Sequence, residues 1–201
     1  MRILIIGASG SIGQVTRKYF IQHSSDYLTL MARHTTSLQK DFNPNREQIF
    51  SGDALDQQQL QAALEKQEVV FAAVSGQIPQ IAQALVEQMP RAHVQRLIFI
   101  TSMGIYNEIP PTVEISGNLK DNPALKPYRQ AADIIEASKL NYTIIRPGWF
   151  DNAADTDYQL TQKGELFGGH DVSRISIANL VFRLAHDPQL GSRASLGINR
   201  V

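Results

Sequence analysis

MRILIIGASGSIG, residues 1–13, decides the fold of this chain. A short apolar run from Ile3 to Ile6 ends at Gly7, and a helical pattern begins where the glycines end at Gly13. A strand, a glycine-rich turn and a helix in this order hold a pyrophosphate, because glycine lets backbone N–H groups approach the phosphate oxygens and the helix turns its positive end toward the anion. We therefore predict a phosphate-binding turn; a tight strand–helix turn without a ligand is the alternative.

The three glycines are spaced G-x-x-G-x-x-G, which differs from the G-x-G-x-x-G of typical dehydrogenases. A glycine triplet by itself is weak evidence for a nucleotide site. A triplet that follows an N-terminal strand and opens a helix is much more specific, because that context is what the phosphate site needs. The third glycine, Gly13, also allows the helix to pack closely against the strand.

Composition indicates a globular protein with a full core. The 201 residues are 43% hydrophobic and 19% charged, which fits one α/β domain over residues 1–201. The formal net charge is zero, so we expect no attraction to nucleic acid. The chain has no cysteine, and its five histidines lack metal-ligand spacing, so we expect neither thiol chemistry nor a metal. No apolar run approaches the roughly 20 residues of a membrane span, and we expect a cytoplasmic protein.

Strand-like and helix-like segments alternate along the chain. Apolar, β-rich runs predict strands at residues 3–6, 27–32, 47–51, 69–74, 97–101, 142–145 and 196–199. Helical patterns lie at residues 11–22, 57–66, 78–89, 128–140 and 176–186. The alternation predicts an α/β fold of the Rossmann type, a doubly wound parallel sheet with helices on both faces.

Ligands in such sheets bind beyond the carboxyl ends of the strands. Several polar or small residues fall at those ends and are expected to share one cleft: Gly7, Arg33, Asp53, Ser75 and Ser102.

Arg33 ends the second predicted strand, about 20 residues past the glycines, where dinucleotide folds meet the adenosine ribose. An acidic residue there would bind the ribose 2′-hydroxyl of NAD, and this sequence has none. A guanidinium instead offers a charge-assisted partner for a phosphate, which favours NADP over NAD. A solvated surface arginine is the alternative. Asp53 is expected either to accept from the adenine amino group or to serve as a turn aspartate.

Two irregular segments are expected to cover the cleft. Residues 104–122 carry Pro110, Pro111 and Gly117, and a loop this long beside a cleft is more often substrate-facing or mobile than structural. Residues 150–170 are polar and contain glycine, and we expect them to form a small C-terminal segment on the substrate side.

With these features in view, the chain resembles an atypical member of the short-chain dehydrogenase/reductase superfamily. The resemblance is to its NmrA-like, or NAD(P)H-binding, group, which includes the biliverdin/flavin reductase-like proteins. It spans most of the chain and rests on GASGSIG at 7–13, GDALD at 52–56, LIFITSMGIY at 97–106, NYTIIRPGWF at 141–150 and VSRISIANL at 172–180. These motifs are specific for the superfamily and the fold, and they do not specify a substrate.

The resemblance implies a role for each matching residue. Arg33 would take the 2′-phosphate of NADP(H), and Ser102 matches the active-site serine that hydrogen-bonds the substrate carbonyl beside the cofactor. The other implied cofactor contacts are Gly7, Ser9, Gly10, Ser11, Ile12 and Gly13 at the pyrophosphate turn, Asp53 and Ala54 at the adenine, Val74, Ser75 and Gly76 along the ribose, and Pro147, Gly148, Trp149 and Phe150 at the nicotinamide.

The chain departs from the superfamily at the catalytic Tyr-x-x-x-Lys. Tyr128 matches the tyrosine, but the lysine position holds Ala132. The resemblance implies that this lysine lowers the tyrosine pKa, and an unperturbed tyrosine with a pKa of about 10 is a poor proton donor at neutral pH. Tyr128 is therefore either a proton donor or a residue of the core or pocket wall. Trp149, Phe150, Tyr106 and Met103 either build an apolar pocket over the nicotinamide or pack in the core.

Two functions of different classes follow. The first is a reductase that passes hydride from NADPH to a small planar acceptor such as a quinone, flavin or carbonyl compound. The second is a non-catalytic NADP(H) sensor that regulates a protein partner, which the missing lysine favours. A sugar-nucleotide epimerase is disfavoured, because the chain lacks room for the larger C-terminal substrate domain of such enzymes. We expect a monomer or a homodimer.

Overall fold

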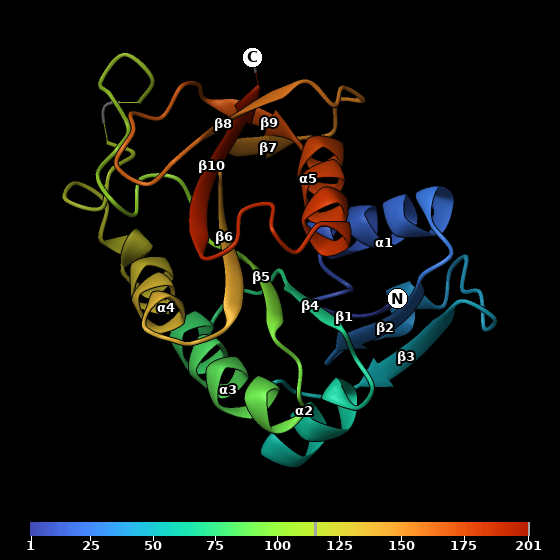
Figure 1. The fold of residues 1–201 in the computed structure, drawn as a ribbon. Coiled ribbons are helices and arrows are strands. Elements are labelled where there is room, and N and C mark those ends of the chain that lie inside the picture. The colour runs from blue at the N-terminus through green and yellow to red at the C-terminus, as the bar shows by residue number, and fades with distance from the viewer. Residues whose placement is uncertain (115, 201) are drawn as a thin grey trace.

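A central eight-stranded sheet organises the computed structural model, which describes residues 1–114 and 116–200 (Figure 1). The strand order is β3-β2-β1-β4-β5-β6-β10-β8. These strands are β1 (Arg2–Ile6), β2 (Tyr27–Ala32), β3 (Glu47–Ser51), β4 (Val69–Ala72), β5 (Arg96–Ile100), β6 (Asn141–Pro147), β8 (Tyr158–Thr161) and β10 (Ala194–Arg200).

The sheet is parallel from β3 to β10, and β8 pairs antiparallel with β10 at the edge. The order reverses at β1, which lies between β2 and β4. A ligand crevice is expected at such a switch point, outside the carboxyl ends of the strands. The predicted doubly wound α/β fold is confirmed.

Helices cover both faces of the sheet (Figure 1). Helices α1 (Ser11–His23) and α5 (Arg174–His186) pack side by side on one face. The other face carries α2 (Gln57–Leu64), α3 (Ile78–Arg91) and α4 (Lys126–Glu136). Two short 3₁₀ helices, Thr36–Leu38 and Pro123–Leu125, lie in connections.

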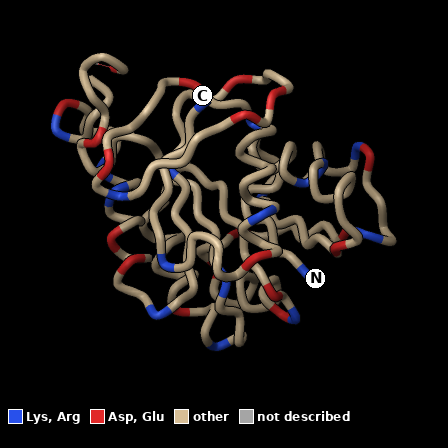
Figure 2. Tube along the Cα trace, turned by 45° about the horizontal axis from the view of Figure 1, so that its top comes forward, with Lys and Arg blue, Asp and Glu red and all other residues tan. Residues whose placement is uncertain are grey.

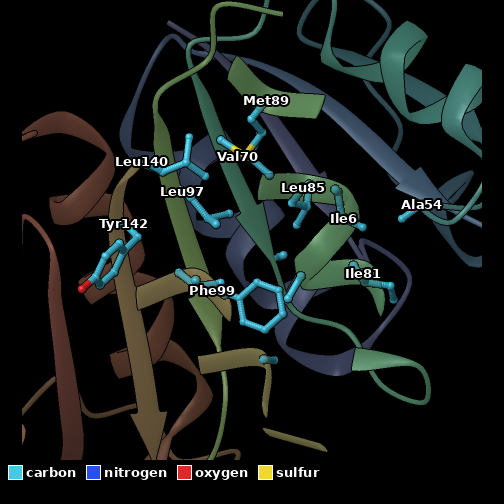
Figure 3. Close-up of a cluster of buried hydrophobic side chains, with 14 of the residues drawn as sticks. Ile6, Ala54, Val70, Ile81, Leu85, Met89, Leu97, Phe99, Leu140 and Tyr142 are labelled. Carbon is cyan, nitrogen blue, oxygen red and sulfur yellow. The ribbon is translucent and has the colours of Figure 1, made fainter. Parts of the chain in front are cut away.

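Each face of the sheet has its own apolar core. Figure 3 shows the core beneath α2, α3 and α4, where Leu85 and Met89 of α3 lie against Val70, Leu97 and other strand residues. Buried on both faces, the central strands are continuous runs of Ile, Leu, Val and Phe, as expected for parallel strands.

The segment that follows β6 is more ordered than the sequence indicated. Residues 150–170 were expected to be irregular, but they contain β8 and the end of β7 (Trp149–Asp151). Strand β7 pairs in parallel with β9 (Asp171–Ser173) in a separate two-stranded sheet. The last helix begins at Arg174 and not at Ser176, because the Ser173 hydroxyl caps it by accepting from the Ser176 N–H at 3.0 Å.

Within residues 1–114 and 116–200, no helix has the length and apolar character needed to cross a membrane.

Candidate functional site

A cavity of about 260 Å³ opens at the carboxyl ends of β1, β2, β3 and β4. It lies at the switch point of the sheet, where a dinucleotide is expected. Many of the residues predicted to bind the cofactor line it together: Gly7, Ser9, Gly10, Arg33, Asp53, Ala54, Val74, Ser75 and Gly76.

The glycine turn is shaped by close backbone packing. Gly7 has φ +82°, and a Cβ there would collide with the Ala73 carbonyl. A Cβ on Gly13 would collide with the Gly7 carbonyl and the Ala8 backbone. These positions therefore require glycine whether or not a ligand is bound.

The start of α1 fits an anion. Gly10 is its N-cap residue, and among the described residues no side chain caps this helix and no acidic residue lies in its first turn. The first N–H groups of a helix have no partner within it, so those of Ser11, Ile12 and Gly13 are available to a phosphate. The residues present fit the pyrophosphate that the motif predicts.

Arg33 and His34 follow β2 and are exposed at the wall of the cavity. Within the described part of the chain, no carboxylate forms an ion pair with the Arg33 guanidinium. The cation therefore remains available to a phosphate. His34, which the sequence did not single out, lines the same wall because it is the next residue past the strand end.

Asp53 has turn contacts of its own. Its Oδ1 accepts from the Leu55 N–H at 3.0 Å, and its own N–H donates to Gln59 Oε1 at 2.8 Å. These bonds support the interpretation of Asp53 as a turn aspartate. Because Asp53 also lines the cavity, its contact with adenine stays a prediction.

A second group of predicted residues meets at the ends of β5 and β6. The Met103 N–H donates to the Pro147 carbonyl at 3.1 Å, which places Ser102 beside Pro147 and Gly148. Ser102 is half-buried and lies outside the cavity at β1–β4. The predicted substrate-side residues are therefore neighbours of one another, one strand beyond the cavity.

The aromatic residues after β6 do not form one pocket. The Trp149 indole N–H donates to Glu114 Oε2 at 3.3 Å, whereas the Phe150 ring lies 4.6 Å from the Arg174 guanidinium carbon. Successive side chains of a strand point to opposite faces, so β7 separates the two rings. Both are exposed, Trp149 at 59% and Phe150 at 40%.

Met103 and Tyr106 have packing roles. Met103 is buried with Ile109 and Phe167 in a small apolar cluster. The Tyr106 hydroxyl donates to Glu136 Oε1 at 2.8 Å. Burial raises the pKa of Tyr106 well above its ordinary value, so this tyrosine is a poor proton donor.

Tyr128 lies in the first turns of α4, half-buried against the apolar cluster beneath α2, α3 and α4. Within residues 1–114 and 116–200, its hydroxyl has no hydrogen-bond partner that would mark it as an activated acid. Ala132, at the lysine position of the superfamily, is fully buried. The structure thus brings Ser102 and Pro147 together and leaves the catalytic role of Tyr128 a prediction.

Comparison with known proteins identifies the family. The model of the NAD(P)H-binding family matches residues 7–188, and the chain belongs to this family. The resemblance to NAD(P)H-binding members of the short-chain dehydrogenase/reductase superfamily is confirmed.

Relatives cover nearly the whole chain. A Rossmann-fold NAD(P)-binding family protein from Shigella flexneri is 34% identical, with a TM-score of 0.84 over 99% of this chain and 93% of that one. A short-chain dehydrogenase/reductase from Veillonella parvula, in complex with NADP, is 27% identical, with a TM-score of 0.91 over 99% and 94%. A Bacillus subtilis protein named an uncharacterized sugar epimerase is 26% identical over 96% of this chain and 92% of its own length.

Proposed function

We propose that this protein is an NADPH-dependent reductase. The observation that carries the cofactor preference is Arg33, exposed at the wall of the cavity at the end of β2, in the position where NAD-binding proteins place an acid. The Veillonella parvula relative in complex with NADP supports the same preference.

Different residues of the chain would bind different parts of the cofactor. The first-turn N–H groups of α1 would hold the pyrophosphate, and the Arg33 guanidinium would hold the 2′-phosphate. When bound, NADPH supplies a hydride from its nicotinamide ring. The Ser102 hydroxyl would donate a hydrogen bond to the oxygen of the acceptor and so fix its orientation.

The need for a proton donor decides which acceptors this protein would reduce. Because Ala132 replaces the lysine that would lower the tyrosine pKa, we expect slow reduction of simple ketones. A quinone or a flavin is reduced to a product that solvent protonates, so it needs no positioned acid. We therefore propose a small planar acceptor of this kind, with carbonyl compounds as poorer substrates.

Parallel calorimetric titrations with NADPH and NADH test the cofactor preference. Charge-assisted hydrogen bonds contribute about 1.5–3 kcal/mol, so Arg33→Ala is expected to weaken NADPH binding by about 10- to 100-fold and to leave NADH binding unchanged. Arg91→Ala is the matched control, because Arg91 is another exposed arginine, at the end of α3 and away from the cavity. Equal binding of NADPH and NADH by the wild-type protein would contradict the preference.

An acceptor screen separates the reductase from two alternatives. Net NADPH oxidation with a quinone or flavin that Ser102→Ala abolishes is the result expected of a reductase. NADPH binding without oxidation by any acceptor would favour a sensor, which the burial of Ala132 in place of a lysine makes the second candidate. An epimerase, as the Bacillus subtilis relative is named, returns the hydride to its substrate and would consume no NADPH.

A further inference from the structure

A buried ion pair joins the two chain segments that form the substrate side. Arg146, in β6, is completely buried, and its guanidinium contacts the carboxylate of Glu108, which is 5% exposed. Glu108 lies in the loop that follows β5, and Arg146 immediately precedes Pro147. Charged residues are almost never buried to this degree unless they are paired.

Glu108 uses its carboxylate to shape the start of the loop. Its Oε1 accepts from the Gly104 N–H at 3.1 Å, and its Oε2 accepts from the Tyr106 N–H at 2.9 Å. Gly104 has φ +81°, a conformation that this double contact helps to fix. The residue before Gly104 is Met103, whose N–H bonds to Pro147 and places Ser102.

Arg146, the other member of the ion pair, contacts the neighbouring strands β10 and β8. Its Nε donates to Ser195 Oγ at 3.1 Å in β10, and one terminal nitrogen lies 3.4 Å from the Thr161 carbonyl in β8. The main-chain carbonyl of Glu108 also accepts from the Phe167 N–H at 2.9 Å. The pair therefore ties β6, β8, β10 and the segment before β9 to the loop that carries Ser102.

We propose that the Arg146–Glu108 pair is a positioning device for the acceptor site. It keeps Ser102 next to Pro147 and Gly148. The distance between the serine hydroxyl and the backbone that would lie beside the nicotinamide then stays constant. This inference rests on the proposed reductase function. A displacement of about 1 Å at a reacting group lowers the rate by as much as 100-fold. A buried ion pair that prevents this displacement would therefore preserve the rate.

A second buried pair in the chain serves as the control. Arg17 Nε contacts Glu47 Oε1 at 2.5 Å, and both side chains are nearly as buried as those of Arg146 and Glu108. Glu47 begins β3, at the opposite end of the strand from the cofactor cavity. Glu108→Gln and Glu47→Gln therefore remove the same charge from similar pairs, one beside the proposed acceptor site and one far from it.

The experiment compares three quantities in the full-length protein. They are the NADPH dissociation constant by calorimetry, the single-turnover rate of menadione reduction at saturating NADPH, and amide hydrogen exchange across residues 102–109 and 148–150. For Glu108→Gln we expect the rate to fall about tenfold or more, the NADPH constant to stay within about threefold, and exchange at Met103, Gly104 and Tyr106 to accelerate. Glu47→Gln is expected to lose thermal stability but to keep the rate.

Breaking a buried pair is strongly destabilising, so Glu108→Asp is made alongside. It keeps the charge and shortens the side chain, and an intermediate rate with native cofactor binding is expected. Unchanged rates in the two Glu108 variants, or an equal loss in Glu47→Gln, would overturn the proposal. A wild-type protein that binds no NADPH or reduces no acceptor would instead overturn the proposed function, and this inference with it.

Discussion

At the scale of single residues, charge contacts tie distant parts of this chain together. Asp26, just before β2, is 5% exposed. Its Oδ1 accepts from the amino group of Met1 at 2.9 Å, and its Oδ2 lies 2.9 Å from His186 Nε2 at the end of α5. Asp26 thereby connects the start of the sheet to the last helix.

The carboxyl of Asp26 makes stability depend on pH. Burial opposes its ionisation, but hydrogen bonds from the amino terminus and Ser24, with the charge of His186, hold its pKa below the ordinary 3.8. A lowered folded-state pKa adds stability above the unfolded pKa, and this stability is lost as pH falls through the folded value. In urea unfolding, we expect Asp26→Asn to be less stable than wild type near pH 6 and the difference to shrink below pH 4.

Asp133→Asn is the control for this series, because Asp133 is an exposed carboxylate in an ion pair with Arg129. Exposed pairs contribute little, so its effect should be small at every pH. A gap between wild type and Asp26→Asn that stays constant from pH 6 to pH 3 would show that Asp26 acts by packing and not by charge.

Gly13 is a second residue whose identity matters on its own. A Cβ there meets backbone atoms of Gly7 and Ala8, which have no room to move. Gly13→Ala is expected to cost about 1–3 kcal/mol in the free energy of unfolding and to weaken NADPH binding by displacing the turn. At Gly10 the nearest atom to an added Cβ is the Gly7 carbonyl oxygen at 3.2 Å, so Gly10→Ala should cost less. Equal losses in the free energy of unfolding for Gly13→Ala and Gly10→Ala, measured in urea, would contradict this account of the turn.

At the scale of elements, periodicity located the regular structure well. The second and third strands, at 27–32 and 47–51, match β2 and β3 residue for residue, because polar turn residues mark both ends of each segment. Strands β7 and β9 were not predicted. Each has three residues, and each is a strand because of its partner, not because of its own sequence.

The sequence likewise predicted some parts of the candidate site and not others. The cavity at β1–β4 was expected from the positions of the strand ends, which the sequence predicts. The Arg146–Glu108 pair could not be predicted, because its members lie 38 positions apart and charged residues are ordinarily read as surface. Trp149 and Phe150 were grouped because both are aromatic, but a strand sends adjacent side chains to opposite faces.

Several contacts hold residues 151–157. The Ser173 and Ser176 hydroxyls donate to the Asp155 carbonyl at 2.6 and 3.0 Å, and an arginine adds two ion pairs. Arg200, at the end of β10, contacts Asp151 at 2.9 Å and Asp155 at 3.0 Å. We expect Arg200→Ala to speed limited proteolysis within residues 151–157 and to change the melting temperature little, since water screens these half-exposed pairs. Lys66→Ala, which removes the exposed contact with Glu65, should leave the cleavage pattern unchanged. Unaltered cleavage in Arg200→Ala would show that the remaining contacts, which include those of Ser173, Ser176 and Arg174, hold the segment without Arg200.

At the scale of the whole molecule, basic and acidic residues balance. Basic and acidic residues are interspersed along the trace, in keeping with the formal net charge of zero (Figure 2). We therefore expect binding specificity to come from single groups at the carboxyl edge of the sheet, such as the Arg33 guanidinium. The cavity at β1–β4 and the Met103–Pro147 hydrogen bond beside Ser102 lie along this edge, and a dinucleotide that reached both would connect the two halves of the sheet.

A ligand that spans the edge should stabilise the native state. At a concentration 100 times its dissociation constant, a ligand that binds only the folded protein adds about 2.7 kcal/mol, which for a chain of this length raises the melting temperature by roughly 5–10 °C. We expect NADPH to give this shift in differential scanning fluorimetry, and NADH at the same concentration to give a smaller one. Arg33→Ala should reduce the NADPH shift to that of NADH, because only the 2′-phosphate distinguishes the two. No shift with either nucleotide, up to millimolar concentration, would mean that the glycine turn of this chain is purely structural.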